Sequence, residues 1–268
     1  MKIVKAFGLL AAALLIGNAA SAQFARTPGY TGSSYKNKDD KNKGAFFQRL
    51  SIGYGLHFTY NALTTTYQYS NSLQTTYLTG MKSTGSTYLY LGSFFNVAKV
   101  ASKSSVAIDV AVSYTGFKFK QDSVTVQSYN KDSLRFYNMR FAEQFPVSII
   151  AIPISIDFRT GGEATLSREN RTSFAIGAGL APSFVNAETN DGSKMKVMPF
   201  MKVEAGFFAG MEFKLRAMAF LGEANYLDNK LAGTSDVVGV TSRKSEGPMG
   251  VNVALAIMPF STKWARAF

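Results

Sequence analysis

The sequence predicts an all-β fold, namely a transmembrane, antiparallel, up-and-down β-barrel of eight strands. Eight segments alternate bulky apolar residues with small or polar ones at a period of two, as the two faces of a strand do. In strands one, three and five the small rows consist largely of Gly, Ala and Ser, whereas the surface of a soluble sheet is rich in Lys and Glu. After the N-terminal leader no run of about 18 apolar residues occurs, so closed β-structure is the remaining way to cross a bilayer.

The N-terminus has the pattern of a signal peptide over residues 1–22. Lys2 and Lys5 provide a basic start, residues 6–16 are apolar, and residues 20–22 are the small Ala-Ser-Ala of a cleavage site. The apolar stretch is too short to span a bilayer as a helix. No cysteine follows the cut before Gln23, which disfavours a lipoprotein anchor. We therefore expect export from the cytoplasm.

Residues 23–45 predict a disordered, basic arm on the periplasmic side. They carry five basic side chains and little apolar material, so they cannot bury enough surface to fold. The barrel is then formed by residues 46–268.

The apolar rows define the eight strands. The first runs from Leu50 to Tyr60 in steps of two. The second, at about 86–97, has a row of Leu89, Leu91, Phe95 and Val97 that is blurred by Tyr88, Tyr90 and Phe94. The other six rows run through Val106 to Tyr114, Ile150 to Phe158, Phe174 to Leu180, Val197 to Phe207, Phe213 to Leu221, and Val251 to Ile257.

Two features complicate the strand count. Pro153 lies inside the fourth strand, and because proline cannot donate to the ladder we expect a bulge or break there. Residues 121–141 read as a hairpin around Asn130-Lys131-Asp132. We interpret it as an extension of strands three and four above the membrane, with a ten-stranded barrel as the open alternative.

The connections alternate in length. Residues 61–85, 117–145, 185–195 and 224–248 are long or polar, whereas 98–103, 159–171 and 209–210 are shorter. Outer-membrane barrels have long extracellular loops and short periplasmic turns, so both termini are predicted to be periplasmic. The loop 61–85 is rich in Thr, Tyr, Ser and Gln, which suits adhesion or the recognition of sugars and proteins, such as an extracellular ligand or an envelope protein. A loop that only stays soluble is the alternative.

Charged residues occur on the inward-facing rows. They are Asp109, Asp157, Lys202, Glu204, Glu212, Lys214 and Arg216. An eight-stranded barrel has room inside for side chains and little else. The near balance of acids and bases therefore predicts a salt-bridge network in the lumen, with solvated charges at the periplasmic rim as the alternative.

The sequence offers little chemistry. It has no Cys, a single His and no nucleotide-binding fingerprint, so we predict no catalytic residue, no cofactor and no metal site. His57 faces inward near the outer end of strand one and would be the only imidazole base of an enzyme. The net charge of +12 suits outer-membrane lipid and lipopolysaccharide rather than nucleic acid, which an exported protein rarely meets. Lysines that only solvate the loops are the alternative.

The Ala-Ser-Ala-Gln cleavage region, the eight alternating segments and the C-terminal Phe268 together resemble small outer-membrane barrel proteins of Bacteroidota, with the architecture of OmpA/OmpX-type barrels. The resemblance implies a location in the cell outer membrane and insertion by the barrel-insertion machinery, which reads a terminal Phe. Lys263, Trp264 and Arg266 interrupt the alternation, so we expect the last strand to stop at Phe260.

Three classes of function follow. The first is a non-enzymatic integral outer-membrane barrel that acts through its extracellular loops or as an envelope assembly component. The alternatives are a narrow outer-membrane channel or transporter and a soluble, periplasmic, lipocalin-like binding barrel.

Overall fold

The computed structural model describes residues 47–70, 73–121, 124–130, 135–141, 144–187, 194–223, 228–230, 239–248 and 250–264. The predicted signal peptide (1–22) and basic arm (23–45) lie outside the described residues, as does Phe268. Among the described residues, no helix combines the length and the apolar character needed to cross a membrane.

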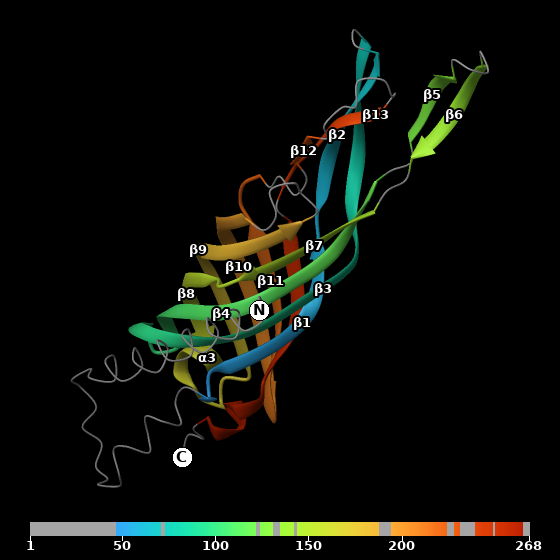
Figure 1. Ribbon diagram of the computed structural model, residues 1–268. Helices are drawn as coiled ribbons and strands as arrows, with labels where there is room; N and C mark the ends of the chain where they lie inside the picture. The colour runs from blue at the N-terminus through green and yellow to red at the C-terminus, as the bar shows by residue number, and fades with distance from the viewer. Residues whose placement is uncertain are drawn as a thin grey trace, which may run out of the picture.

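Antiparallel strands close into a ring of eight positions (Figure 1). In chain order the ring strands are β1 (Leu50–Phe58), β3 (Leu73–Ala101), β4 (Ser104–Gln121), β7 (Gln144–Ala151) with β8 (Ile154–Gly161), β9 (Thr172–Ala187), β10 (Lys194–Ala209), β11 (Met211–Phe220) and β14 (Val251–Met258). Each pairs with the next, and β14 pairs with β1 to close the ring. The eight-stranded, up-and-down barrel is therefore confirmed.

The hairpin at residues 121–141, which was the reason for the ten-stranded alternative, does not join the ring. β5 (Val124–Asn130) and β6 (Arg135–Phe141) pair only with each other, as a separate two-stranded sheet. This sheet lies beyond the barrel, past the ends of β4 and β7 (Figure 1). The ten-stranded alternative is wrong because strands β4 and β7 already pair directly with each other.

The predicted break at Pro153 is confirmed. Residues 152 and 153 separate β7 from β8, which together fill one position between β4 and β9. The ladder is bridged on both sides, because Ala111 N donates to Pro153 O and Ile152 N donates to Pro182 O. Proline is tolerated here because its missing N–H falls where the two half-strands meet.

The register turns the bulky rows outward, as predicted. Ile52 is 47% exposed and Ile176 is 43% exposed, whereas Gly53 and Ala107 are buried. The structure also shows which residues of the second predicted strand face outward. Tyr88, Tyr90 and Phe94 are buried inside the barrel, whereas Leu89 and Val97 face outward. Gly53 explains how an aromatic row fits, because a Cβ at this position would collide with the Tyr90 ring.

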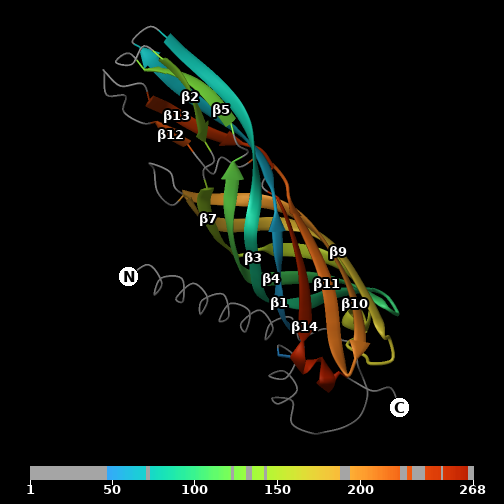
Figure 2. The same cartoon turned by 90° about the vertical axis from the view of Figure 1, so that its right-hand side faces the viewer.

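The long loops were predicted wrongly in part, because much of their length is strand. β2 (Tyr60–Ser70), the first part of β3 and β13 (Gly239–Glu246) extend the sheet far beyond the ring, with β12 (Asp228–Lys230) beside β13 (Figures 1 and 2). Thr and Tyr favour strands even when they are polar. A polar composition therefore did not imply irregular structure over 61–85. We call this end of the molecule the hairpin end.

The opposite end, here called the short-turn end, carries the β3–β4 turn, the tight turn at Gly210, α3 (Gly162–Thr165) and η1 (Pro259–Lys263). The last strand stops at Met258, slightly before the predicted Phe260. Both ends of the described barrel meet here. Trp264 Nε1 donates to Gln48 O at 3.0 Å, and the rings of Phe47 and Phe260 make an edge contact.

Candidate functional site: a buried ionic cluster in the lumen

The lumen is layered, and its lowest layer is apolar. Phe94, Ala107, Met258 and Trp264 form a buried cluster at the short-turn end, with Leu166 and Phe208 packed against it. The Trp264 indole stacks on Phe208, with 6.1 Å between ring centroids. Because Trp264 follows η1, the segment after the last strand folds back and closes this end of the barrel.

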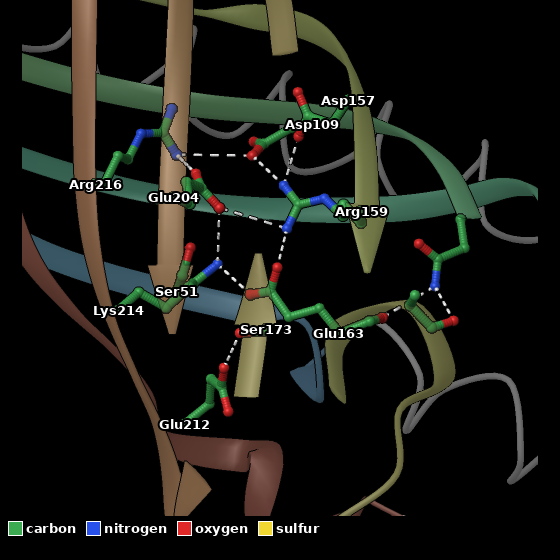
Figure 3. A network of polar contacts seen from close by, with 12 residues as sticks. Ser51, Asp109, Asp157, Arg159, Glu163, Ser173, Glu204, Glu212, Lys214 and Arg216 are labelled. Carbon is green, nitrogen blue, oxygen red and sulfur yellow. Dashed lines mark hydrogen bonds and ion pairs between the residues drawn. The ribbon is translucent and has the colours of Figure 1, made fainter. Parts of the chain in front are cut away.

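Above this layer lies a group of eight buried charges, here called the ionic cluster. Figure 3 shows its members except Lys202. Its members are Asp109, Asp157, Arg159, Glu163, Lys202, Glu204, Lys214 and Arg216. Four are acids and four are bases, so the cluster is neutral as a whole. Buried charges are tolerated only when they are paired, and this balance satisfies that condition.

Arg159 lies at the centre of the ionic cluster and contacts all four carboxylates. Its Nη2 lies 2.8 Å from Asp109 Oδ2 and 2.5 Å from Asp157 Oδ2. Its Nη1 pairs with Glu163 and lies 3.4 Å from Glu204 Oε2. The guanidinium also lies over the Phe94 ring at 4.0 Å, which joins the ionic cluster to the apolar layer below it.

The other three bases complete the network around Asp109 and Glu204. Lys202 pairs with Asp109, and its Nζ lies 2.9 Å from Asp157 Oδ2. Lys214 Nζ lies 3.2 Å from Glu204 Oε2, and Arg216 Nη1 lies 3.0 Å from Glu204 Oε1. Each carboxylate of the cluster thus has at least two cationic partners.

The ionic cluster is assembled from four strands and one turn. β4 supplies Asp109, β8 supplies Asp157 and Arg159, and β10 and β11 supply the remaining members except Glu163. Glu163 comes from α3, where its carboxylate reaches Lys214 Nζ at 2.5 Å. Asn96 on β3 holds α3 in place, since its Nδ2 donates to the carbonyls of Glu163 and Ala164 at 3.2 Å each.

Small inward residues provide the space for these charges. Gly177 on β9 lies opposite Asp157, and a Cβ there would collide with the Asp157 carboxylate. The Gly and Ala rows in the sequence therefore have a packing reason, because one strand leaves room for the charged side chains of its neighbour.

Six of the seven predicted lumen residues meet in the ionic cluster, and Glu212 does not. Glu212 is buried nearer the short-turn end, where it accepts a hydrogen bond from Ser173 Oγ and makes no ion pair with any described residue (Figure 3). The membership of Glu212 is therefore a correction to the prediction. Parity places a residue inside the barrel, but its height along the strand decides which charges it can reach.

Sequence reasoning missed Arg159 and Glu163. Arg159 has the same parity as Asp157, so extending the predicted strand by one residue beyond Phe158 would have found it. Glu163 had no such signal. It lies in a turn that folds inward, between Gly161 at φ 81° and Leu166 at φ 51°.

The two buried glutamates of β10 and β11 should respond differently to loss of charge. We expect Glu204→Gln to cost about 3 kcal/mol or more of unfolding free energy, because it leaves one buried cation in excess. Glu212→Gln is the matched control and should cost less than about 1 kcal/mol, since an amide oxygen still accepts the Ser173 hydrogen bond. Denaturant titration of both variants refolded in lipid vesicles measures the difference. Equal losses of unfolding free energy in the two variants would contradict the conclusion that Glu204 is stabilised by its ion pairs in the ionic cluster.

His57 lies above the ionic cluster and is fully buried. Its Nδ1 lies 2.7 Å from Asn252 Oδ1, and its ring packs on Phe117 with 4.6 Å between centroids. Its Nε2 has no hydrogen-bond partner among the described residues. No described carboxylate pairs with His57 in a base-and-acid arrangement. In the part of the chain that is described, no group of His, Cys, Asp and Glu is arranged to hold a metal ion.

The uppermost layer of the lumen is mainly apolar, although Thr65 and Gln121 are also buried at this end. The inward residues of β11 show the sequence of layers, since Lys214 and Arg216 are followed by Met218 and Phe220. A large buried cluster includes these last two with Phe117, Phe119 and Phe200, and it reaches Leu63 in the extended sheet. Side chains thus pack the described lumen from the short-turn end to the hairpin end.

Comparison with known proteins adds little to this geometry. No model of a protein family matches the chain, and no curated protein matches it. A solved structure found by the comparison is the attachment invasion locus protein Ail of Yersinia pestis. It is 8% identical, the match covers 78% of this chain and 97% of that chain, and the TM-score is 0.25. The fold assignment therefore rests on the ring of strand pairings itself.

Proposed function

We propose that this chain is an integral outer-membrane β-barrel with a packed lumen, which has no enzymatic activity and acts through the sheet and loops of its hairpin end or as an envelope assembly component. One observation carries the proposal. The barrel buries the eight charged side chains of the ionic cluster in its lumen and exposes a row of bulky apolar side chains on every strand of the ring, an arrangement that a protein dissolved in water does not have.

The exposed apolar residues form a belt around the whole ring. Each ring strand contributes to it, as these residues show: Ile52, Leu89, Tyr114, Ile156, Ile176, Val203, Leu215 and Leu255. Exposing apolar surface to water costs about 25 cal/mol per Å², and soluble monomers rarely expose large contiguous patches. Lipid chains remove that cost, which favours a membrane barrel over the soluble lipocalin-like alternative.

The orientation proposed for the barrel follows from its two unlike ends. In outer-membrane barrels the short turns face the periplasm and the long connections face outward. The described chain begins and ends at the short-turn end, so we place the termini in the periplasm. The partners we propose are outer-membrane lipid and lipopolysaccharide, the barrel-insertion machinery and a ligand or envelope protein at the hairpin end. The Bacteroidota type stays a prediction.

The packed lumen argues against the channel alternative. A continuous aqueous path would have to pass the Trp264 layer, the ionic cluster and the aromatic layer above it. We therefore expect the purified protein to give no steady conductance steps in planar lipid bilayers. A porin of known conductance, inserted under the same conditions, is the control. Steady, large single-channel steps from the purified protein would refute the proposal that the lumen is packed and does not conduct.

A further inference from the structure

Three lysines gather on the outer surface of β3 and β4, just beyond the apolar belt. Lys82 and Lys120 are direct cross-strand partners, and Lys118 lies two residues along β4 on the same face. All three are exposed. Within the described part of the chain no carboxylate forms an ion pair with any of them. We call Lys82, Lys118 and Lys120 the lysine triad.

The arrangement of the lysine triad is unfavourable for the isolated protein. Side chains directly opposite each other on paired strands are about 5 Å apart at Cβ, and like charges in such positions repel. The Lys82–Lys120 pair is of this kind, and Lys118 adds a third positive charge on the neighbouring row. An anion bound between the three ammonium groups would relieve the repulsion, and phosphate is the anion that membranes offer at this height.

A hollow of about 550 Å³ is lined by one member of the lysine triad, Lys118, while Lys82 and Lys120 lie outside its lining. Its lining includes Tyr114, Gly116, Lys118, Pro146, Ser148 and Asn186. These are outward-facing positions of β4, β7 and β9, so the hollow opens on the outside of the barrel. Two small residues of its lining, Gly116 and Ser148, are paired across β4 and β7, and the Tyr114 ring lies over Gly116.

The position of the hollow along the barrel axis, between the apolar belt and the lysine triad, limits the kind of ligand that can occupy it. Below it begins the apolar belt, with Leu89, Tyr114 and Ile150 exposed on adjacent strands. Above it lies the lysine triad. An occupant must therefore carry apolar chains on one side and a negative charge on the other. The hydroxyl of Ser148, the amide of Asn186 and the phenol of Tyr114 are neutral donors and acceptors of the kind that bind sugar hydroxyls.

From these observations we infer that the lysine triad and the adjacent hollow bind the phosphorylated sugar headgroup of a glycolipid in the outer leaflet. The lysines hold the phosphate, the hollow holds a sugar ring, and the acyl chains lie along the apolar belt. This inference rests on the proposed membrane location, because it places the hollow at the lipid headgroups of the leaflet that faces outward.

Native mass spectrometry of the full chain in detergent micelles tests the inference with three probes: bisphosphorylated lipid A, its dephosphorylated form and phosphatidylglycerol. We expect bisphosphorylated lipid A to bind at least about ten-fold more tightly than either other probe, a difference of about 1.4 kcal/mol. The variant carrying Lys82→Gln, Lys118→Gln and Lys120→Gln should lose that preference. The matched control carries Lys99→Gln, Lys103→Gln and Lys263→Gln, three exposed lysines at the short-turn end, and should keep it.

Two further measurements keep the test decisive. The triad variant should unfold at the same temperature as the original protein or higher, because it loses a like-charge contact, so weaker binding cannot be attributed to misfolding. Gly116→Val keeps all three lysines but adds bulk to the floor of the hollow beside the Tyr114 hydroxyl, and should weaken lipid A binding at least about five-fold.

Equal binding by the dephosphorylated form, or an unchanged affinity of the triad variant for lipid A, would refute the inference that the lysine triad binds the phosphate. Equal binding by phosphatidylglycerol would overturn the assignment of a glycolipid. Failure of the protein to float with lipid vesicles would instead refute the proposed membrane function, and that measurement does not depend on the triad.

Discussion

Arg159→Met is expected to lower the free energy of unfolding of the barrel by about 3–5 kcal/mol. Arg159 is fully buried and contacts the carboxylates of Asp109, Asp157, Glu163 and Glu204. Methionine fills a similar volume but leaves the ionic cluster with one uncompensated negative charge among buried side chains. The measurement is equilibrium unfolding in denaturant of the protein refolded into phospholipid vesicles.

Two comparisons make the Arg159 result specific. Arg171→Met changes an exposed arginine at the short-turn end and should alter the unfolding free energy by less than about 0.5 kcal/mol. The double variant Arg159→Met with Glu163→Gln restores neutrality and should recover part of the loss, which a double-mutant cycle measures. A loss for Arg159→Met no larger than that for Arg171→Met would show that the ionic cluster does not stabilise the barrel.

The second large effect concerns the outer surface. Leu255 on β14 is 72% exposed and lies within the apolar belt, between Leu215 and Tyr54 on its neighbouring strands. If this surface contacts hydrocarbon, we expect Leu255→Arg to destabilise the barrel in lipid vesicles by about 2–4 kcal/mol, because a lipid-facing cation near the bilayer midplane loses its hydration.

The chain contains a matched control for Leu255. Leu78 on β3 is 73% exposed but lies in the extended sheet beyond the ring. Leu78→Arg introduces the same charge at the same exposure and should change the unfolding free energy by less than about 0.5 kcal/mol. If both variants are equally stable in vesicles, the apolar belt does not contact lipid and the membrane proposal is refuted.

The periodicity of the chain was sufficient to predict most of the barrel. A strand places alternate side chains on opposite faces, so the rows that contain Ile52 and Ile176 could be assigned before any strand was paired. The lengths of the connections were less informative. The Thr-rich segment 61–85 was predicted as a loop, yet it pairs as strands β2 and β3, because composition does not show whether a polar segment finds a partner.

For the ionic cluster, too, the sequence pattern predicted some residues and could not place others. Parity alone identified Asp109, Lys202 and Arg216 as inward-facing, and the structure brings them into one network. Parity could not exclude Glu212, whose side chain lies at a different height in the lumen. Nor could it find Glu163, which reaches the lumen from α3 and not from a strand.

Residue order alone was enough to assign the apolar face of each strand, because a period of two follows from the geometry of a single extended chain. The same pattern indicated that strands one, three and five turn mostly small residues, Gly, Ala and Ser, towards the lumen. The partners of the buried charges, in contrast, follow from the closed ring of strands. The register between β9 and β8 sets Gly177 opposite Asp157, and the fold of α3 brings Glu163 to Arg159. Such contacts join residues from different parts of the chain, so their distances depend on how the ring closes and not on any local pattern.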